Sequence, residues 1–320
     1  WTADDIETSA NGATSVFAAD MDGDGDMDIV SASSGDDTIA WYENDGAADP
    51  SWTASHIDHG GADGANCVFV ADMDNDGDMD IISASANDNK IAWYENDGGS
   101  DPTWAASEIA TSASKAWSVF AADMDNDGDM DILSASYNDH TIAWYENDGA
   151  SDPSWDASDI ATNASAARSV FAADMDNDGD MDIISASESD DTIAWYENDG
   201  STDPSWAASD IATSANGAYS VFATDMDNDG DMDILSASVL DNTIAWYEND
   251  GASDPSWAAS DIATSASGAY SVFAADMDGD GDIDIISASF NDDTIAWYET
   301  SAIPEFSNIM MPIVSVLAIV

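Results

Sequence analysis

The chain has 320 residues, of which 67 are Asp or Glu and only three are Lys or Arg, so its formal net charge at pH 7 is −64. A charge of this size excludes nucleic acid as a partner, because two polyanions repel each other. The length is sufficient for one large domain or two ordinary ones.

The first stretch with strand character is Trp1–Thr8, and its pattern returns at Trp257–Thr264. A short apolar strand at residues 15–19 then leads into an acidic loop, and residues 27–33 lead out of it. A polar turn separates this pair from a third strand at residues 38–43, and a turn rich in Asp, Gly and Pro precedes a fourth strand. No window has helical periodicity. The pattern therefore predicts a nearly all-β chain of short strands.

The acidic loop, Asp20–Asp28, has acidic side chains at its positions 1, 3, 5, 7 and 9 and a glycine, Gly25, at position 6. The loop returns five times, 52 and then 51 residues apart, beginning at Asp72, Asp123, Asp174, Asp225 and Asp276. Everything between the loops repeats with them, which predicts a closed repeat architecture.

Carboxylates on alternate residues repel one another in an ordinary strand, but they can surround a hard cation that takes about six to eight oxygen ligands. The glycine at position 6 supplies the sharp turn that such a loop needs. An EF-hand begins in the same way but requires Glu at position 12, where this chain has Ser31, and helices on both sides. The loop is therefore interpreted as a calcium site inside a β-hairpin, and the alternative is a solvated acidic turn.

Four short strands per unit, separated by turns, are typical of a propeller blade. Six loop copies predict six blades. Because the chain opens on a fourth strand and its repeats end on a third strand at Glu299, we expect residues 1–8 to complete the last blade and close the ring. Residues 1–299 are thus expected to form one propeller domain, and residues 300–320 a separate tail.

The motif Asp-x-Asp-x-Asp-Gly-x-x-Asp between two strands, followed by Ile-Ala-Trp-Tyr-Glu, resembles the FG-GAP/VCBS repeats of integrin α-subunit propellers and many secreted microbial proteins. The resemblance covers residues 1–299 and implies six Ca²⁺ ions, bound by the side chains of positions 1, 3, 5 and 9 and by the carbonyl of position 7. The ligands that it implies are Asp20, Asp22, Asp24, Asp26 and Asp28; Asp72, Asp74, Asp76, Asp78 and Asp80; Asp123, Asp125, Asp127, Asp129 and Asp131; Asp174, Asp176, Asp178, Asp180 and Asp182; Asp225, Asp227, Asp229, Asp231 and Asp233; and Asp276, Asp278, Asp280, Asp282 and Asp284.

Six bound Ca²⁺ ions would bring the formal charge only from −64 to about −52, so the remaining acids must be solvated or screened. Extracellular calcium modules need only weak binding, whereas cytosolic calcium is too low to fill such loops. We therefore expect the chain to work outside the cell, secreted or attached to the cell surface.

Two sets of positions vary while the scaffold is kept. Six residues before each loop the chain has Thr14, Asn66, Trp117, Arg168, Tyr219 and Tyr270, and after each Ser-Ala-Ser it has Ser34, Ala86, Tyr137, Glu188, Val239 and Phe290. In an up-and-down blade both sets lie on the face opposite the acidic loops. We call Trp117, Tyr137, Tyr219, Tyr270 and Phe290 the aromatic face. They are candidate ligand-binding residues, and the alternative is that they cap the core.

No catalytic constellation is found in the sequence, so a non-enzymatic role is expected. The sequence favours an extracellular, calcium-stabilised structural or adhesive module that meets a protein or glycan at the cell surface. The alternatives are a carbohydrate-binding lectin that uses the aromatic face and, third, the non-catalytic part of a secreted enzyme.

The apolar tail, residues 301–320, departs from the repeats. Its Pro304-Glu-Phe306 resembles a type of C-terminal sorting signal found in archaea and bacteria. The 12 residues from Ile309 to Val320 would span about 18 Å as a helix, too short for a bilayer core of about 30 Å. The tail is therefore expected to be an anchor or sorting remnant, or a strand that links subunits into a homo-oligomer or filament.

Overall fold

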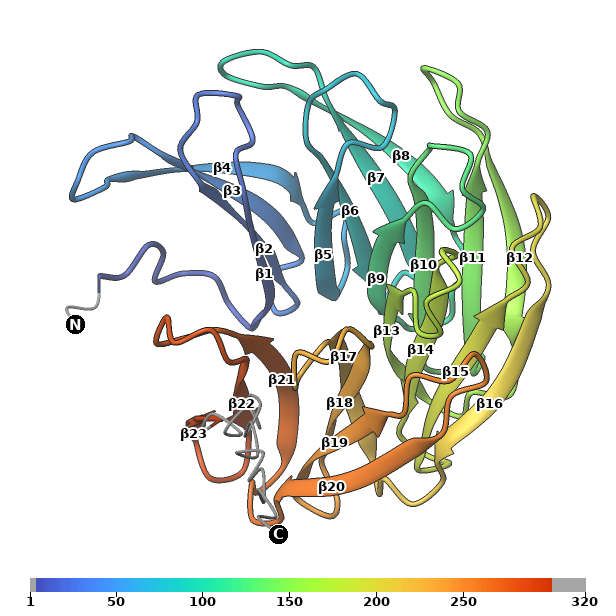
Figure 1. Cartoon of the computed structure of the whole chain (residues 1–320). Helices are drawn as coiled ribbons and strands as arrows, with labels where there is room; N and C mark the ends of the chain where they lie inside the picture. Colours follow the sequence, from blue (N-terminus) through green and yellow to red (C-terminus); the bar gives the residue numbers. More distant parts are fainter. Residues whose placement is uncertain (1–3, 301–320) are drawn as a thin grey trace, which may run out of the picture.

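The structure is a computed structural model that describes residues 4–300 of the chain. These residues form 23 antiparallel β-strands and no helix, arranged as six sheets around a common axis (Figure 1). The predicted all-β propeller with six blades is confirmed. Residues 4–300 contain no helix that is long and apolar enough to cross a membrane.

The strands follow one another in sheet order within each blade. The blades consist of β1 (Ala13–Ala19), β2 (Asp28–Ser33), β3 (Thr38–Asn44) and β4 (Trp52–His59); β5 (Ala65–Ala71), β6 (Asp80–Ser85), β7 (Lys90–Asn96) and β8 (Trp104–Ala110); β9 (Ala116–Ala122), β10 (Asp131–Ser136), β11 (Thr141–Asn147) and β12 (Trp155–Ala161); β13 (Ala167–Ala173), β14 (Asp182–Ser187), β15 (Thr192–Asn198) and β16 (Trp206–Ala212); β17 (Ala218–Thr224), β18 (Asp233–Ser238), β19 (Thr243–Asn249) and β20 (Trp257–Ala263); and β21 (Ala269–Ala275), β22 (Asp284–Ser289) and β23 (Thr294–Tyr298).

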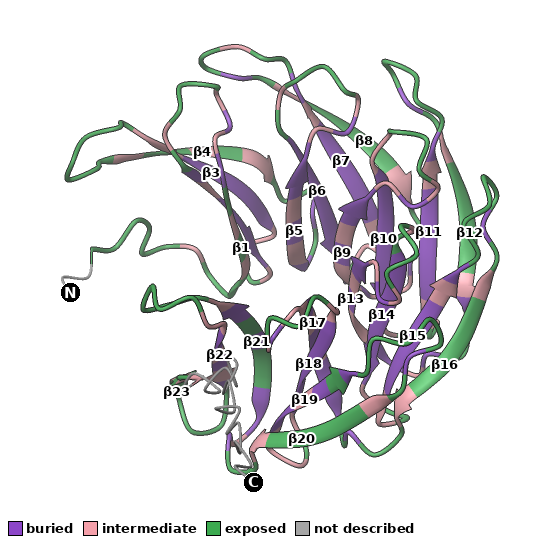
Figure 2. Ribbon diagram, in the orientation of Figure 1, coloured by how far each residue is buried: buried purple, intermediate pink, exposed green. Residues whose placement is uncertain are grey.

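The first strand of each blade lies innermost, and its phenylalanine touches the phenylalanine of the next blade. The ring centroids of Phe17 and Phe69 are 4.8 Å apart, and contacts of 4.6 to 5.1 Å continue this row to Phe273. The fourth strands lie outermost and are largely exposed (Figure 2). The acidic loops join first to second strands, so they lie at one end of every blade, and the turns between second and third strands lie at the other.

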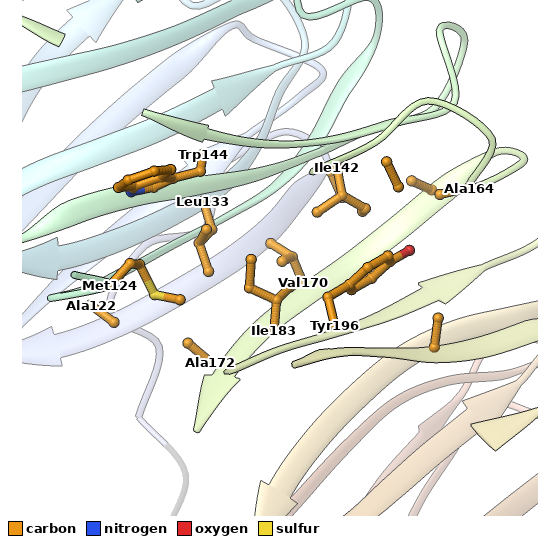
Figure 3. Packing of buried hydrophobic residues seen from close by; sticks show 14 residues of the cluster. Ala122, Met124, Leu133, Ile142, Trp144, Ala164, Val170, Ala172, Ile183 and Tyr196 are labelled. Atoms are coloured by element: carbon orange, nitrogen blue, oxygen red, sulfur yellow. The ribbon is translucent and has the colours of Figure 1, made fainter. Parts of the chain in front are cut away.

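The apolar core consists of five clusters, each shared by two successive blades. Figure 3 shows the cluster between the third and fourth blades, where Leu133 and Trp144 meet Val170, Ile183 and Tyr196. In the first four blades, the tryptophan of the third strand also packs edge-on against the tryptophan that opens the fourth strand of the next blade. The centroids of these pairs are 6.2 to 6.4 Å apart. Each blade is therefore stabilised mainly by its neighbours.

Within residues 4–300 the ring is open between the sixth and first blades, which corrects the expectation that the N-terminal strand closes it. The sixth sheet has three strands among the described residues, and residues 4–8 form no strand. Val16, which faces the gap, is 70% exposed, whereas its counterpart Val170 in the fourth blade is 3% exposed. Figure 1 shows β1 and β21 flanking this gap.

A ring of repeated blades closes only if the rotations between successive blades add up to a full turn. Nearly the same side chains pack at all five interfaces, so each blade is turned by a similar amount relative to the last. Six such blades leave β21 short of β1. Ile6 instead lines a hollow on the flank of the first blade together with Val16 and Phe17.

Several predictions fall on residues outside the described part of the chain. Trp1, which would open the closing strand, is one of residues 1–3. The tail at residues 301–320, with its expected role as an anchor, a sorting remnant or a link between subunits, also lies outside the described residues.

The open edge predicts that equivalent tryptophans differ in their contribution to stability. Trp195 is 2% exposed and packs against Trp257, whereas Trp297, at the same place in the sixth blade, is 52% exposed. Trp195→Ala should lower the free energy of unfolding by about 3–5 kcal/mol because it leaves a cavity. Trp297→Ala should cost less than about 1 kcal/mol, because it leaves none. Chemical denaturation measures both, and equal costs would show that the ends of the ring meet in solution.

Candidate calcium loops and the aromatic face

Carboxylates of the first five acidic loops converge although no protein cation balances them. Among residues 4–300 there are six groups of at least three metal-binding types of side chain whose ligand atoms lie within 4.8 Å of one another. Five of these groups are Asp20, Asp22 and Asp28; Asp72, Asp74 and Asp80; Asp123, Asp125 and Asp127; Asp174, Asp176 and Asp178; and Asp225, Asp227 and Asp229. The loops thus bring together the side chains of positions 1 and 3 with those of position 5 or 9.

Backbone N–H groups fix the shape of each loop. In the third blade, Gly128 N donates to Asp123 Oδ2 at 3.0 Å, and Asp129 N donates to Asp127 Oδ1 at 2.9 Å. Gly128 has a φ of 98°, which a residue with a side chain rarely adopts. This requirement explains the glycine at position 6.

The aspartate at position 9 connects the loop to the rest of its blade. Asp131 is 1% exposed. One carboxylate oxygen accepts a hydrogen bond from Met124 N at 3.0 Å, and the other accepts one from Asn147 N at 2.8 Å. The same two backbone bonds recur at Asp28, Asp80, Asp182 and Asp233. Position 9 is thus a structural clamp as well as a candidate ligand.

In the second to fifth blades, the asparagine side-chain amide at the end of the third strand holds neighbouring loops together. Asn147 Nδ2 donates to the carbonyl of Met130 in its own loop at 3.0 Å and to that of Met73 in the preceding loop at 2.7 Å. Equivalent buried bonds join the first and second, third and fourth, and fourth and fifth loops. Reasoning from sequence missed this role, although the Asn that follows Trp-Tyr-Glu in the first five copies is its visible signal.

The donor set fits Ca²⁺. It consists of hard carboxylate oxygens, the ligands that Ca²⁺ prefers, and the loops contain no His or Cys that would favour a transition metal. The position-7 carboxylates turn away from the clusters: a Cβ placed on Gly149 would lie 2.1 Å from Asp129 Oδ2. That arrangement leaves the carbonyl of position 7 as its candidate ligand, as the resemblance implies.

Burial and neighbouring like charges make the charged loops costly. Burial, and next the charge of Asp76, raise the pKa of Asp74, and Asp125 and Asp176 are raised in the same way by burial and by Asp127 and Asp178. Burial raises the pKa of Asp80, Asp131 and Asp182 to about 7. A divalent cation would remove this cost by neutralising the clustered carboxylates.

On the opposite face, the structure brings all five residues of the aromatic face into one continuous stack. Trp117 contacts Tyr137 and Tyr219, each with ring centroids 6.2 Å apart. Tyr219 lies 4.0 Å from Tyr270, which lies 6.3 Å from Phe290. Trp117 and Tyr219 belong to the third and fifth blades, so their contact spans the fourth blade.

Two of the three basic residues of the chain lie within this stack. The Arg168 guanidinium carbon is 3.9 Å from the ring centroid of Trp117, and Lys115 Nζ is 4.2 Å from that of Tyr137. Arg168 also forms an ion pair with Glu188. Sequence reasoning noted Arg168 and Glu188 as variable positions but did not predict that they pair.

The aromatic face is partly a cap and partly open to solvent. Tyr219 is 8% exposed, and burial raises its pKa above the usual range. Tyr270 is 38% exposed and Phe290 is 76% exposed. The surface available to a ligand therefore lies at the Tyr270 and Phe290 end of the stack.

The buried position-9 aspartates predict how the metal-free protein responds to pH. The folded-state pKa of about 7 at Asp80, Asp131 and Asp182 lies above the ordinary aspartate value of about 3.9, so the folded state binds these protons more tightly than the unfolded state does. In calcium-free buffer, stability should rise as the pH falls from about 7 towards 4 and be lost as the pH rises through about 7. Urea denaturation at a series of pH values measures this, and a metal-free protein that gains stability above pH 7 would contradict it.

Solved structures with the same fold include two with limited sequence identity. A structure titled as the specific recognition of non-reducing terminal N-acetylglucosamine by an Agrocybe aegerita lectin is 19% identical, with a TM-score of 0.59, over 85% of this chain and 73% of that one. A protein from Lactobacillus plantarum is 14% identical, with a TM-score of 0.63, over 90% of this chain and 81% of that one. Both likenesses concern the fold alone. No curated protein matches the chain.

The repeats themselves match a family model described as the FG-GAP-like repeat. Five overlapping matches cover residues 20–83, 72–134, 123–185, 174–236 and 225–287. Each match runs from one acidic loop to the second strand of the following blade, so it includes two loops and the core between them. The chain belongs to the FG-GAP-like repeat family.

Proposed function

We propose that the chain is a calcium-stabilised, non-catalytic binding module that works outside the cell. The observation that carries this proposal is the recurrence, in the first five blades, of a cluster of three carboxylates in a loop that ends on a buried aspartate. The clusters lie at the ends of the inner strands, where loops must meet for the blades to pack. Calcium bound there would relieve repulsion within each loop and stabilise the interfaces that the loops share.

The surroundings of the histidines support a role without catalysis. His140 Nδ1 accepts a hydrogen bond from Ala166 N at 2.9 Å. In the next blade, Asp191 Oδ1 accepts the equivalent hydrogen bond from Gly217 N. His59 Nδ1 lies 2.8 Å from the Thr38 hydroxyl oxygen. Both therefore take part in the bonding of their strands and turns.

The partner surface is the exposed end of the aromatic face. Repetition makes the blades nearly identical, so a surface unique to a few blades is where a specific contact can form. Phe290 is 76% exposed, and Leu240, in the corresponding turn of the fifth blade, is 64% exposed, so both offer apolar area that the fold does not use. We propose that a protein or glycan at the cell surface binds there, which makes the module adhesive.

A glycan is the second candidate partner within this proposal. Exposed aromatic rings stack on the flat apolar faces of sugars, and one propeller of the same fold is titled as a lectin that recognises N-acetylglucosamine. The likeness supports only the choice of ligand class for testing.

Calcium dependence is tested by thermal denaturation with Ca²⁺ and with chelator. A site filled at 100 times its dissociation constant adds about 2.7 kcal/mol, so several filled sites should raise the melting temperature strongly. Mg²⁺ is the control, because it sheds its water reluctantly and should stabilise less. Dissociation constants of about 10⁻⁴–10⁻³ M would fit an extracellular module. Equilibrium dialysis that finds no bound Ca²⁺ would overturn the proposal.

The partner surface is tested with the Tyr270→Ala and Phe290→Ala variants. Binding to cells or to a glycan array should fall about tenfold or more if these rings form the centre of the contact. Trp297→Ala is the matched control, since Trp297 is an exposed aromatic residue at the open edge, away from the stack. Unchanged binding by both aromatic-face variants, or an equal loss with Trp297→Ala, would exclude this surface.

A further inference from the structure

An asparagine at position 4 of three acidic loops reaches across to the next blade. Asn75 Nδ2 donates to Asp129 Oδ1, Asn126 to Asp180 and Asn177 to Asp231, each at 2.6 Å. We call Asn75, Asn126 and Asn177 the bridging asparagines. In every case the acceptor is the position-7 aspartate of the following loop.

The acceptor is held from two sides. Asp129 Oδ2 lies against Gly149 of its own blade, as described above, and Asp129 Oδ1 accepts the amide of Asn75 from the blade before. Position 7 is the residue whose carbonyl is the candidate calcium ligand. The bridging asparagine therefore positions a candidate ligand of a loop to which it does not belong.

The remaining loops lack this bond, and the differences follow the sequence. Position 4 is Gly23 in the first loop and Gly279 in the sixth, and neither has a side chain to donate. Asn228 in the fifth loop reaches only the carbonyl of Gly281, at 3.4 Å. All these positions have φ between 58° and 79°, so asparagine and glycine both fit the backbone.

This inference rests on the proposed calcium sites. We propose that the bridging asparagines couple calcium binding from each loop to the next, from the second loop to the fifth. Position 4 lies between the candidate ligands at positions 3 and 5, so an ion in one loop fixes its asparagine. The fixed asparagine then holds position 7 of the next loop ready for its own ion. Coupling of this kind is reciprocal, so each loop also strengthens the one before it.

Electrostatics alone predicts the opposite behaviour. Each Ca²⁺ ion that binds reduces the net charge of −64, so each later ion should bind more weakly. The bridging asparagines oppose this trend locally. A titration in concentrated KCl screens the charge effect and leaves the coupling through contacts to be measured.

The first experiment compares two double variants of the full chain by calorimetric titration with Ca²⁺. Asp22→Asn with Asp24→Asn disables the first loop, and Asp125→Asn with Asp127→Asn disables the third. Both loops keep their buried bonds from the asparagines that end the third strands, so the comparison isolates the bridging asparagines. The first variant should lose one site only. The second should lose one site and weaken both neighbouring sites by about fivefold, the low end of measured coupling, because these bonds are exposed.

The second experiment uses Asn126→Gly, with Asn228→Gly as its matched control. Both changes place glycine at a φ of about 60°, but only Asn126 reaches an aspartate. Asn126→Gly should leave the number of ions unchanged and weaken the pair of third and fourth sites about fivefold. The two variants should have the same stability in calcium-free buffer, which a purely structural role for Asn126 would change.

The outcomes separate the coupling from the calcium proposal itself. Equal isotherms for Asn126→Gly and Asn228→Gly, together with the loss of one site alone in each double variant, would overturn the coupling and leave the calcium sites standing. An intact chain that binds no Ca²⁺ would overturn both. A fivefold weakening confined to the bridged loops supports both.

Discussion

Repulsion between carboxylates is the constraint on which the rest of this structure depends. The chain carries 67 acids against three Lys or Arg, and thirty of those acids occupy six short loops. The fold meets this constraint by turning the loops so that backbone N–H groups donate to many of the carboxylates and by burying one aspartate per loop between two such donors. Hydrogen bonds to backbone supply part of the compensation, and a divalent cation would supply the rest.

The blades depend on one another because each holds only half of an apolar core. Trp144 of the third blade packs against Trp206 of the fourth, and Phe120 meets Phe171. The loops are joined across the same interfaces by Asn147 and its equivalents. Packing and the candidate metal sites are therefore parts of one arrangement, and the open edge at β23 shows what a blade loses when no neighbour covers it: Ile295 is 75% exposed.

Against this uniform background the aromatic face is the region where the copies differ most. Its inner part, Trp117 and Tyr219, encloses Arg168 and stabilises that cation through ring contacts and Glu188. Its outer part, Tyr270 and Phe290, remains open to solvent. A scaffold that is fixed by repetition and a surface that varies between blades are the two ingredients of a binding module whose specificity can change without affecting its fold.

The sequence by itself determined the class of fold, the number of blades, the strand order within each blade and the positions of the clustered carboxylates. These follow from local patterns, namely the alternation of strands and turns, the period of 51 residues and the loop glycine, and local patterns are set by neighbouring residues. Only the tertiary structure decided whether the ring closes, because closure depends on a small rotation summed over five interfaces. It also decided that Trp117 reaches Tyr219 over Arg168 and that Asn75, Asn126 and Asn177 bridge successive loops. Those contacts join residues about one or two blades apart, and no pattern within a single repeat specifies them.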